Sequence, residues 1–205
     1  MVQTGKFQVY YKRVKSELED IQASNNYMSL SKAFAHWYLL NFLDIDAHEL
    51  GEIVIDGDGD NGIDAIVYKN DTMKLFQFKF PDKITNLSKQ IDEKTALKLI
   101  NGYKKLTSGR KPRKANDNFL NFRDTVKNKS IFNYEFVFVS FSDGLSDNSD
   151  DALQTELENI KKLTGNSLKI QVEDKKRICD KIDRLQKKNI VNLCLLYTSD
   201  AADEL

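Results

Sequence analysis

Residues 59–80 read GDNGIDAIVYKNDTMKLFQFKF, and two β-branched or aromatic runs in this stretch flank the polar pair Asn70-Asp71. Short runs of this kind, divided by Asn and Asp, predict two antiparallel strands joined by a tight turn. A turn centred on Asn70 and Asp71 sets the pairing so that Asp64 faces Gln77. The stretch therefore predicts a β-hairpin that carries an acid opposite an amide.

Polar side chains gather on one face of this hairpin. Side chains alternate along a strand, so Gln77 and Lys79 share a face with Leu75. The opposite face carries three aromatic residues, Phe76, Phe78 and Phe80. Directly opposed residues have Cβ atoms roughly 5 Å apart and diagonal ones about 7–8 Å, so Asp64, Gln77 and Lys79 can reach one common ion or water. A hairpin with one solvated face is the plain alternative, but Ile66 and Leu75 share this face and make it at least half buried.

These residue types suit a hydrolytic metal site. The Asp64 carboxylate, the Gln77 amide oxygen and the backbone carbonyl of Phe78 can bind a hard divalent cation such as Mg²⁺ or Mn²⁺. Lys79 beside that cation can orient an attacking hydroxide and neutralise charge in a phosphorane-like transition state. The hairpin thus predicts phosphodiester hydrolysis, with Asp64, Gln77 and Lys79 as catalytic residues and Asp64 and Gln77 as metal ligands.

The apolar periodicity of the whole chain predicts an α/β protein. Helical spacing is found in residues 14–21, 30–42, 91–106, 119–126, 153–163 and 175–188. Strand-like runs are found in residues 52–55, 63–68, 74–80, 134–141 and 168–172. Residues 134–141 are apolar on both faces, as expected for a central strand. The expected architecture is a mixed central sheet flanked by helices, made of an antiparallel meander of three strands, a helical crossover and a buried fourth strand.

The motif residues resemble a known nuclease family. GDNGIDAIVYKND, followed by LFQFKF, is similar to the PD-(D/E)XK nuclease motif in the GD-x-GID…Q-x-K form of Mrr-like restriction enzymes. With AFAHWYLLNFLDID (residues 33–46) before it, the pattern resembles the N-terminal domain of abortive-infection phage-resistance (AIPR) proteins. The motifs that carry the resemblance lie within residues 30–107.

The resemblance implies a restriction-endonuclease-like three-layer core and a Mg²⁺- or Mn²⁺-dependent endonuclease. The expected substrate is nucleic acid, DNA in particular, and the expected role is anti-phage defence. The resemblance matches Asp64 to the metal-binding acid, Gln77 to the second metal position and Lys79 to the lysine, and it matches Asp60 to a loop acid. Gln77 replaces the commoner Glu, which removes one negative charge, and no helical Glu is evident near residues 34–36. A restriction-fold module that binds nucleic acid or protein without cutting is the alternative.

A basic stretch follows the motif. No acid occurs between Thr95 and Asn116, while Lys and Arg accumulate around Gly109 and Pro112. Such a loop can grip a phosphate backbone with an affinity that falls as salt rises, although a solvated helix end is the alternative interpretation. The expected nucleic-acid-binding residues are Lys104, Lys105, Arg110, Lys111, Arg113 and Lys114.

Residues 56–62 contain two further patterns of small and acidic residues. A GxGxxG pattern is spelled by Gly57, Gly59 and Gly62. It lies between two expected strands rather than before a helix, and its neighbouring acids repel pyrophosphate, so we reject a dinucleotide site. Positions one, three and five of a calcium loop are matched by Asp56, Asp58 and Asp60, but the loop lacks the Gly at position six and the Glu at position twelve. A calcium-binding structural domain is a third hypothesis, which requires these three acids to converge and Asp64 to point elsewhere.

Length and composition set the broad class of the protein. The chain has 205 residues, of which 40% are apolar and 30% charged, and it fits one globular domain. It contains no apolar run long enough to span a membrane and no secretion signal at its start, which predicts a soluble, cytoplasmic protein without a membrane partner. Cys179 and Cys194 are too few for a disulfide framework or a Cys-based zinc site, so any metal requires oxygen ligands.

The last residues differ in character from the rest. CLLYTSDAADE, from Cys194 to Glu204, resembles the translation of a sequencing-library adapter. We therefore expect residues 1–193 to form a single domain, with two N-terminal helices, a core at about residues 49–172 and a C-terminal helix, and residues 194–205 to be a non-native tail. The formal charge is zero overall, and because the tail is acidic the remainder is mildly basic. A lost C-terminal region of the same protein and a second copy of the chain are further candidate partners.

Overall fold

The computed structural model describes the backbone of residues 2–200 and the side chains of residues 5–188. It contains the hairpin predicted from residues 59–80, in which β1 (Ala65–Lys69) and β2 (Thr72–Lys79) pair antiparallel with Tyr68 opposite Met73. Asn70 and Asp71 both have positive φ values, 51° and 55°. Two consecutive residues in this conformation match the right-handed twist of the flanking strands, so the predicted turn and register are confirmed.

The hairpin forms one edge of a four-stranded mixed sheet in the order β1-β2-β3-β4. β3 (Asn133–Ser140) runs parallel to β2, and β4 (Ser167–Glu173) runs parallel to β3. β3 is therefore the central strand that the apolar run at residues 134–141 predicted. Each parallel connection passes through helices, as parallel strands require.

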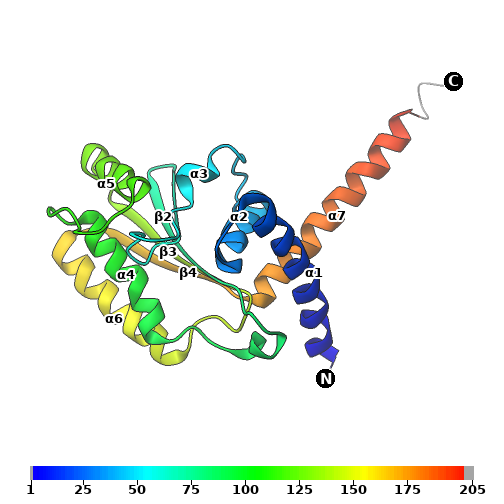
Figure 1. Cartoon of the computed structure of the whole chain (residues 1–205), viewed down its shortest axis with the longest axis horizontal. Coiled ribbons are helices and arrows are strands. Elements are labelled where there is room, and N and C mark those ends of the chain that lie inside the picture. Colours follow the sequence, from blue (N-terminus) through cyan, green and yellow to red (C-terminus); the bar gives the residue numbers. More distant parts are fainter. Residues whose placement is uncertain (1, 201–205) are drawn as a thin grey trace.

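Helices cover both faces of the sheet and make three layers (Figure 1). One face is covered by α1 (Val2–Asn25), α2 (Leu30–Phe42) and α7 (Lys175–Asp200). The other face is covered by α4 (Glu93–Thr107), α5 (Asp117–Lys129) and α6 (Asp147–Thr164). A short 3₁₀ helix, η1 (Ile84–Ser88), follows β2. Two separate apolar clusters fill the spaces between the layers, which confirms the predicted three-layer α/β class.

Local capping explains where several of these helices begin and end. The Ser29 side chain accepts a hydrogen bond from the Lys32 amide at the start of α2, and Asp92 accepts from the Thr95 amide at the start of α4. Such side chains satisfy amides that have no partner within the helix. Gly165, with φ of 72°, ends α6 in the left-handed conformation that glycine adopts readily.

The strand predicted at residues 52–55 is wrong. Glu52 and Ile53 end a single helical turn, α3 (Leu50–Ile53), and Val54 forms an isolated antiparallel bridge with Ala65. Leu50 and Ile53 are three residues apart, so the helical turn buries both on one side. A short apolar run fits either a helical turn or a strand, and here packing favours the turn. The expected meander of three strands is therefore a two-stranded hairpin with one bridge beside it.

The predicted non-native tail falls partly beyond the structure. Residues 201–205 lie outside the described residues, and the backbone of residues 194–200 continues α7. Among the helices of residues 2–200, none combines the length and the apolar character that a membrane span needs.

Candidate functional site

Asp64 is held against β2 at the open end of the hairpin. Its amide donates to the Phe76 carbonyl at 2.9 Å, and its carboxylate oxygen Oδ2 accepts from the Phe78 amide at 2.7 Å. The second bond occupies one carboxylate oxygen and aims the acid at the strand that carries Gln77 and Lys79. The backbone thus brings together the three residues that the sequence predicted.

These residues line an open cavity of about 470 Å³. Its walls come from the loop before β1, from the end of β2 and from one face of α4. The lining residues are Asp56, Asp60, Asn61, Gly62, Asp64, Gln77, Lys79, Lys98, Asn101 and Lys105. The sequence patterns pointed to most of them, but they gave no role to Asn61 or Asn101, counted Lys98 only within the basic stretch after Thr95, and included Asp56 only as part of a calcium loop. Both α4 residues lie one helical turn apart on the face toward this loop, which is a signal visible only once α4 is docked.

Three carboxylates converge in the cavity. Asp56, Asp60 and Asp64 each offer an oxygen, and these oxygens all lie within 4.8 Å of one another. Burial raises the pKa of Asp64 to about 7, although the hydrogen bond from the Phe78 amide lowers it. Burial, followed by the negative charge of Asp60, also raises the pKa of Asp56. Acids packed this closely favour either protons or a cation between them.

Gln77 is a second, independent indication that the cavity binds a ligand. Its side chain is 2% exposed, and its carbonyl oxygen Oε1 accepts no hydrogen bond from any described residue. A buried polar oxygen without a partner destabilises a fold by about 1–3 kcal/mol. Carboxylate and amide oxygens are the ligands that Mg²⁺ and Mn²⁺ prefer. The residues of the cavity therefore fit a hard divalent cation.

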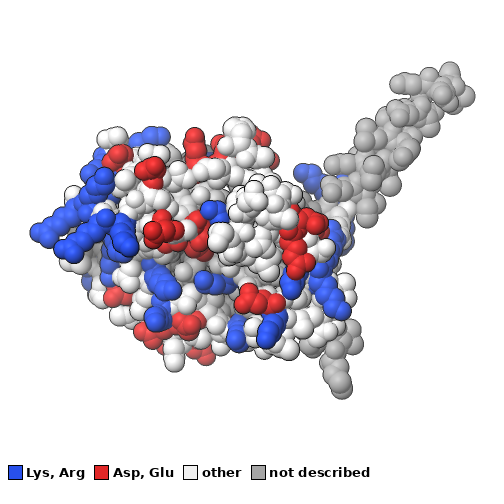
Figure 2. All heavy atoms as spheres, in the orientation of Figure 1, with Lys and Arg blue, Asp and Glu red and all other residues white. Residues whose placement is uncertain are grey.

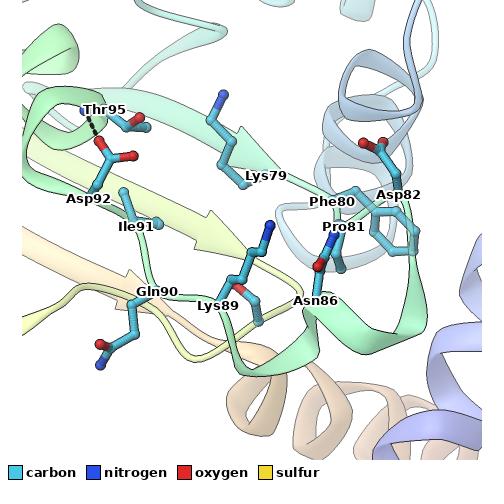
Figure 3. Close-up of a pocket in the computed structure, with 11 residues that line it drawn as sticks. Lys79, Phe80, Pro81, Asp82, Asn86, Lys89, Gln90, Ile91, Asp92 and Thr95 are labelled. Carbon is cyan, nitrogen blue, oxygen red and sulfur yellow. Dashed lines mark hydrogen bonds between the residues drawn. The ribbon is translucent and has the colours of Figure 1, made fainter.

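Lys79 stands at the rim of this cavity. It is the last residue of β2, its side chain is exposed, and its carbonyl accepts from the Phe141 amide at 3.0 Å. Lys79 also lines a neighbouring cavity of about 200 Å³ beyond the end of β2. Figure 3 shows its amino group directed away from Lys89 in that second cavity. A lysine shared by the two cavities can reach a chain of phosphates that crosses both.

The acidic loop, residues 56–62, is hydrogen-bonded to the basic loop at residues 108–116. The Asn61 amide nitrogen donates to the carbonyls of Gly59 (2.8 Å) and Lys114 (3.1 Å), and its oxygen accepts from Lys105 Nζ at 3.0 Å. The Asn116 amide donates to the Gly59 carbonyl at 3.2 Å. Asn61 thus joins the loop of Asp60 to the loop that carries most of the basic residues.

Two glycines allow this close approach. A Cβ added at Gly59 lies 2.7 Å from the Asn116 nitrogen, and one added at Gly62 lies 2.8 Å from the Lys98 carbonyl. Both residues also have positive φ, 86° and 89°. These glycines serve loop packing, which agrees with the rejection of a dinucleotide-binding motif.

Most of the predicted nucleic-acid-binding residues line one hollow beside the acidic cavity. This hollow measures about 390 Å³ and is lined by Asn61, Lys105, Ser108, Arg110, Lys111, Pro112, Arg113 and Lys114. Figure 2 shows basic side chains gathered over the loop after α4, next to acidic side chains. Lys104 lies apart from them, because its Nζ contacts Glu156 Oε2 on α6 at 2.6 Å. The expected cluster therefore holds for the loop and for Lys105 but not for Lys104.

Other expectations are answered by the same geometry. The calcium-loop hypothesis required Asp58 to converge with Asp56 and Asp60, whereas Asp64 takes that place and the exposed Asp58 is outside the cluster. α2 contains no glutamate, and its Lys32 Nζ donates to the backbone carbonyl of Asp56 at 2.9 Å.

Comparison with known proteins identifies no relative. No protein-family model, curated protein or solved structure matches the chain.

Proposed function

We propose that the protein is a metal-dependent endonuclease of the PD-(D/E)XK type that hydrolyses phosphodiester bonds of nucleic acid, DNA in particular. The observation that carries the proposal is that Asp64, Gln77 and Lys79 line one cavity, where the buried Gln77 oxygen has no hydrogen-bond partner among the described residues. The resemblance of the motif to Mrr-like and AIPR proteins extends the proposal to anti-phage defence in the cytoplasm.

Asp64 and Gln77 would hold the cation, together with a further acid of the cavity. Their oxygens match the chemistry of Mg²⁺ and Mn²⁺, as described above. When bound, the cation supplies positive charge against the phosphodiester and lowers the pKa of the attacking water.

The protein's own residues bind and orient the substrate. The exposed Lys79 ammonium can donate hydrogen bonds to the attacking water and offset the charge that develops on the phosphate oxygens. The loop cations Arg110, Lys111 and Arg113 can bind flanking phosphates beside the cavity. Water supplies a hydroxyl group to phosphorus and a proton to the leaving oxygen, so the hydrolysis balances without another reactant.

A binding module without catalysis is the second candidate. Two observations favour it: Gln77 brings no negative charge to the cavity, and α2 brings Lys32 instead of an acid. Either feature weakens a cation site relative to one in which an acid occupies that position. The basic loop would serve such a module equally well.

Cleavage of supercoiled plasmid by the full chain separates the two candidates. We expect nicking that requires Mg²⁺ or Mn²⁺ and falls at least about 100-fold in Asp64→Ala and in Lys79→Ala. Asp58→Ala is the matched control, because Asp58 belongs to the same acidic loop but is exposed and outside the cluster. If the folded wild type binds DNA without cutting it, the binding module is the better description.

A further inference from the structure

The three carboxylates of the cavity differ in what already occupies their oxygens. Both oxygens of Asp60 are engaged by its own loop: Oδ1 accepts from the Gly62 amide at 2.7 Å, and Oδ2 accepts from the Gly57 amide at 3.2 Å. The Asp60 amide also donates to the Gly57 carbonyl at 3.2 Å. Asp60 therefore stabilises the conformation of its loop, and these hydrogen bonds occupy part of the acceptor capacity of its carboxylate.

Asp64 is half engaged. Its Oδ2 accepts from the Phe78 amide, whereas Oδ1 has no hydrogen-bond partner among the described side chains and backbone. One oxygen fixes the side chain, and the other is available to a ligand. This is the arrangement expected of a ligating carboxylate that a second contact orients.

Asp56 is the acid whose carboxylate is unengaged. Within residues 5–188 this carboxylate accepts no hydrogen bond and forms no ion pair, although Asp56 is half buried and lines the cavity. Its backbone is fixed nonetheless, because its amide donates to the Asp64 carbonyl at 3.0 Å and its carbonyl accepts from Lys32 Nζ at 2.9 Å. A fixed backbone beside Asp64 and a free carboxylate are the two properties that a ligand position needs.

Asp56 can add negative charge that the cation site otherwise lacks. The position opposite Asp64 on β2 is Gln77, which offers an oxygen but no charge, and its Oε1 is buried without a partner. A single carboxylate and an amide make a weak site for a divalent cation, and a second carboxylate strengthens it. Asp56 can supply that charge, because a carboxylate oxygen of Asp56 lies within 4.8 Å of one of Asp64.

We propose that Asp56 is the second anionic ligand of the cation and replaces the charge that Gln77 lacks, while Asp60 is a positioning residue that holds the loop. The inference rests on the cation of the proposed nuclease, but it concerns cation binding and not cleavage. It adds a ligand to Asp64 and Gln77 that lies eight residues before Asp64, outside the positions that the motif matched, and it gives the loop acid Asp60 a positioning role.

Mn²⁺ titration of the metal-free full chain by calorimetry tests this assignment. We expect Asp56→Asn to weaken Mn²⁺ binding at least about 10-fold, as Asp64→Asn does, and Asp58→Asn to leave it unchanged. Asp60→Asn should lower the melting temperature and change Mn²⁺ affinity less than Asp56→Asn does, because the amide oxygen can still accept from Gly62. The decisive variant is the double substitution Asp56→Asn with Gln77→Glu, which restores the charge at the other position and should recover most of the affinity.

Several outcomes would overturn the assignment. Wild-type affinity in a folded Asp56→Asn protein would do so, as would failure of the double variant to bind better than Asp56→Asn, or absence of Mn²⁺ binding by the wild type. Plasmid cleavage reports separately on the proposed function. Loss of Mn²⁺ binding in Asp56→Asn supports the assignment even if no DNA is cut. If the wild type cuts DNA and Asp56→Asn binds Mn²⁺ as tightly as the wild type, the assignment is refuted and the proposed nuclease function is not.

Discussion

The two faces of β2 are built for opposite purposes. On one face Phe76 and Phe78 stack with ring centroids 5.6 Å apart, and Phe34 of α2 meets Phe78 edge to face at 5.9 Å. On the other face Gln77 is buried with an unpartnered oxygen and Lys79 is exposed. The aromatic face gains from burial, whereas the polar face gives up stability to keep ligand atoms available.

The comparison shows how one strand can carry both a core and a site. Alternation of side chains keeps the aromatic residues apart from Gln77 and Lys79, since a residue never changes face along a regular strand, while the buried Leu75 anchors the polar face. The rigid aromatic layer then fixes the backbone from which Gln77 and Lys79 project. Stability and function of this strand should therefore respond to different substitutions.

The largest expected effect lies on the aromatic face. Phe78→Ala should lower the free energy of unfolding by about 3–5 kcal/mol, because Phe78 is fully buried and contacts aromatic rings of α2. Lys79→Ala, one residue away, should change it by less than about 0.5 kcal/mol because its side chain is exposed. Urea denaturation of both variants measures this difference, and equal losses would contradict the separation of roles.

On the polar face, removing a charge should stabilise the metal-free protein. The pKa of Asp64 rises from its ordinary 3.8 to about 7 in the fold, so ionisation opposes folding as the pH climbs from about 4 to 7. The penalty is absent below about pH 4 and complete above pH 7. With a chelator present, Asp64→Asn should therefore raise the free energy of unfolding by roughly 1–3 kcal/mol at pH 8, and by less at pH 5.

Denaturation curves at both pH values check this prediction. Asn keeps an oxygen that can accept from the Phe78 amide, so the comparison isolates the charge. A variant less stable than the wild type at pH 8, or a gain in stability that does not depend on pH, would show that the fold does not raise the pKa of Asp64.

The smallest expected effects lie at the rim of the polar face. Lys111→Gln and Arg113→Gln should each lower the salt dependence of DNA binding by about one unit of slope, log Kd against log salt. Lys104→Gln is the matched control, because Glu156 already pairs with Lys104. Fluorescence anisotropy with a labelled duplex and a chelator measures the slopes, and an equal change in all three variants would mean that no particular surface binds DNA.

Part of this geometry could be predicted from local spacing. The Asn70-Asp71 turn and the alternation in residues 74–80 were sufficient for the register, the aromatic face and the meeting of Asp64 with Gln77 and Lys79. The strand predicted at residues 52–55 was wrong for the same local reason, because a short apolar run fits one helical turn as well as a short strand.

Other features depend on contacts between distant residues. The free carboxylate of Asp56 and the pairing of Lys104 with Glu156 follow from how loops and helices dock, whereas the contacts of Asp60 with Gly57 and Gly62 are local. Asn61, which ties the acidic loop to the basic one across 53 residues of sequence, belongs to the same group.

The sequence by itself determined the hairpin, the α/β class and the trio of Asp64, Gln77 and Lys79, because periods of two and of 3.6 residues are present in neighbouring positions. Only the tertiary structure decided which acids are free, which basic residues face the cavity and which loops are joined. Those properties arise from packing between elements that no short-range spacing encodes, and the assignment of Asp56 rests on them.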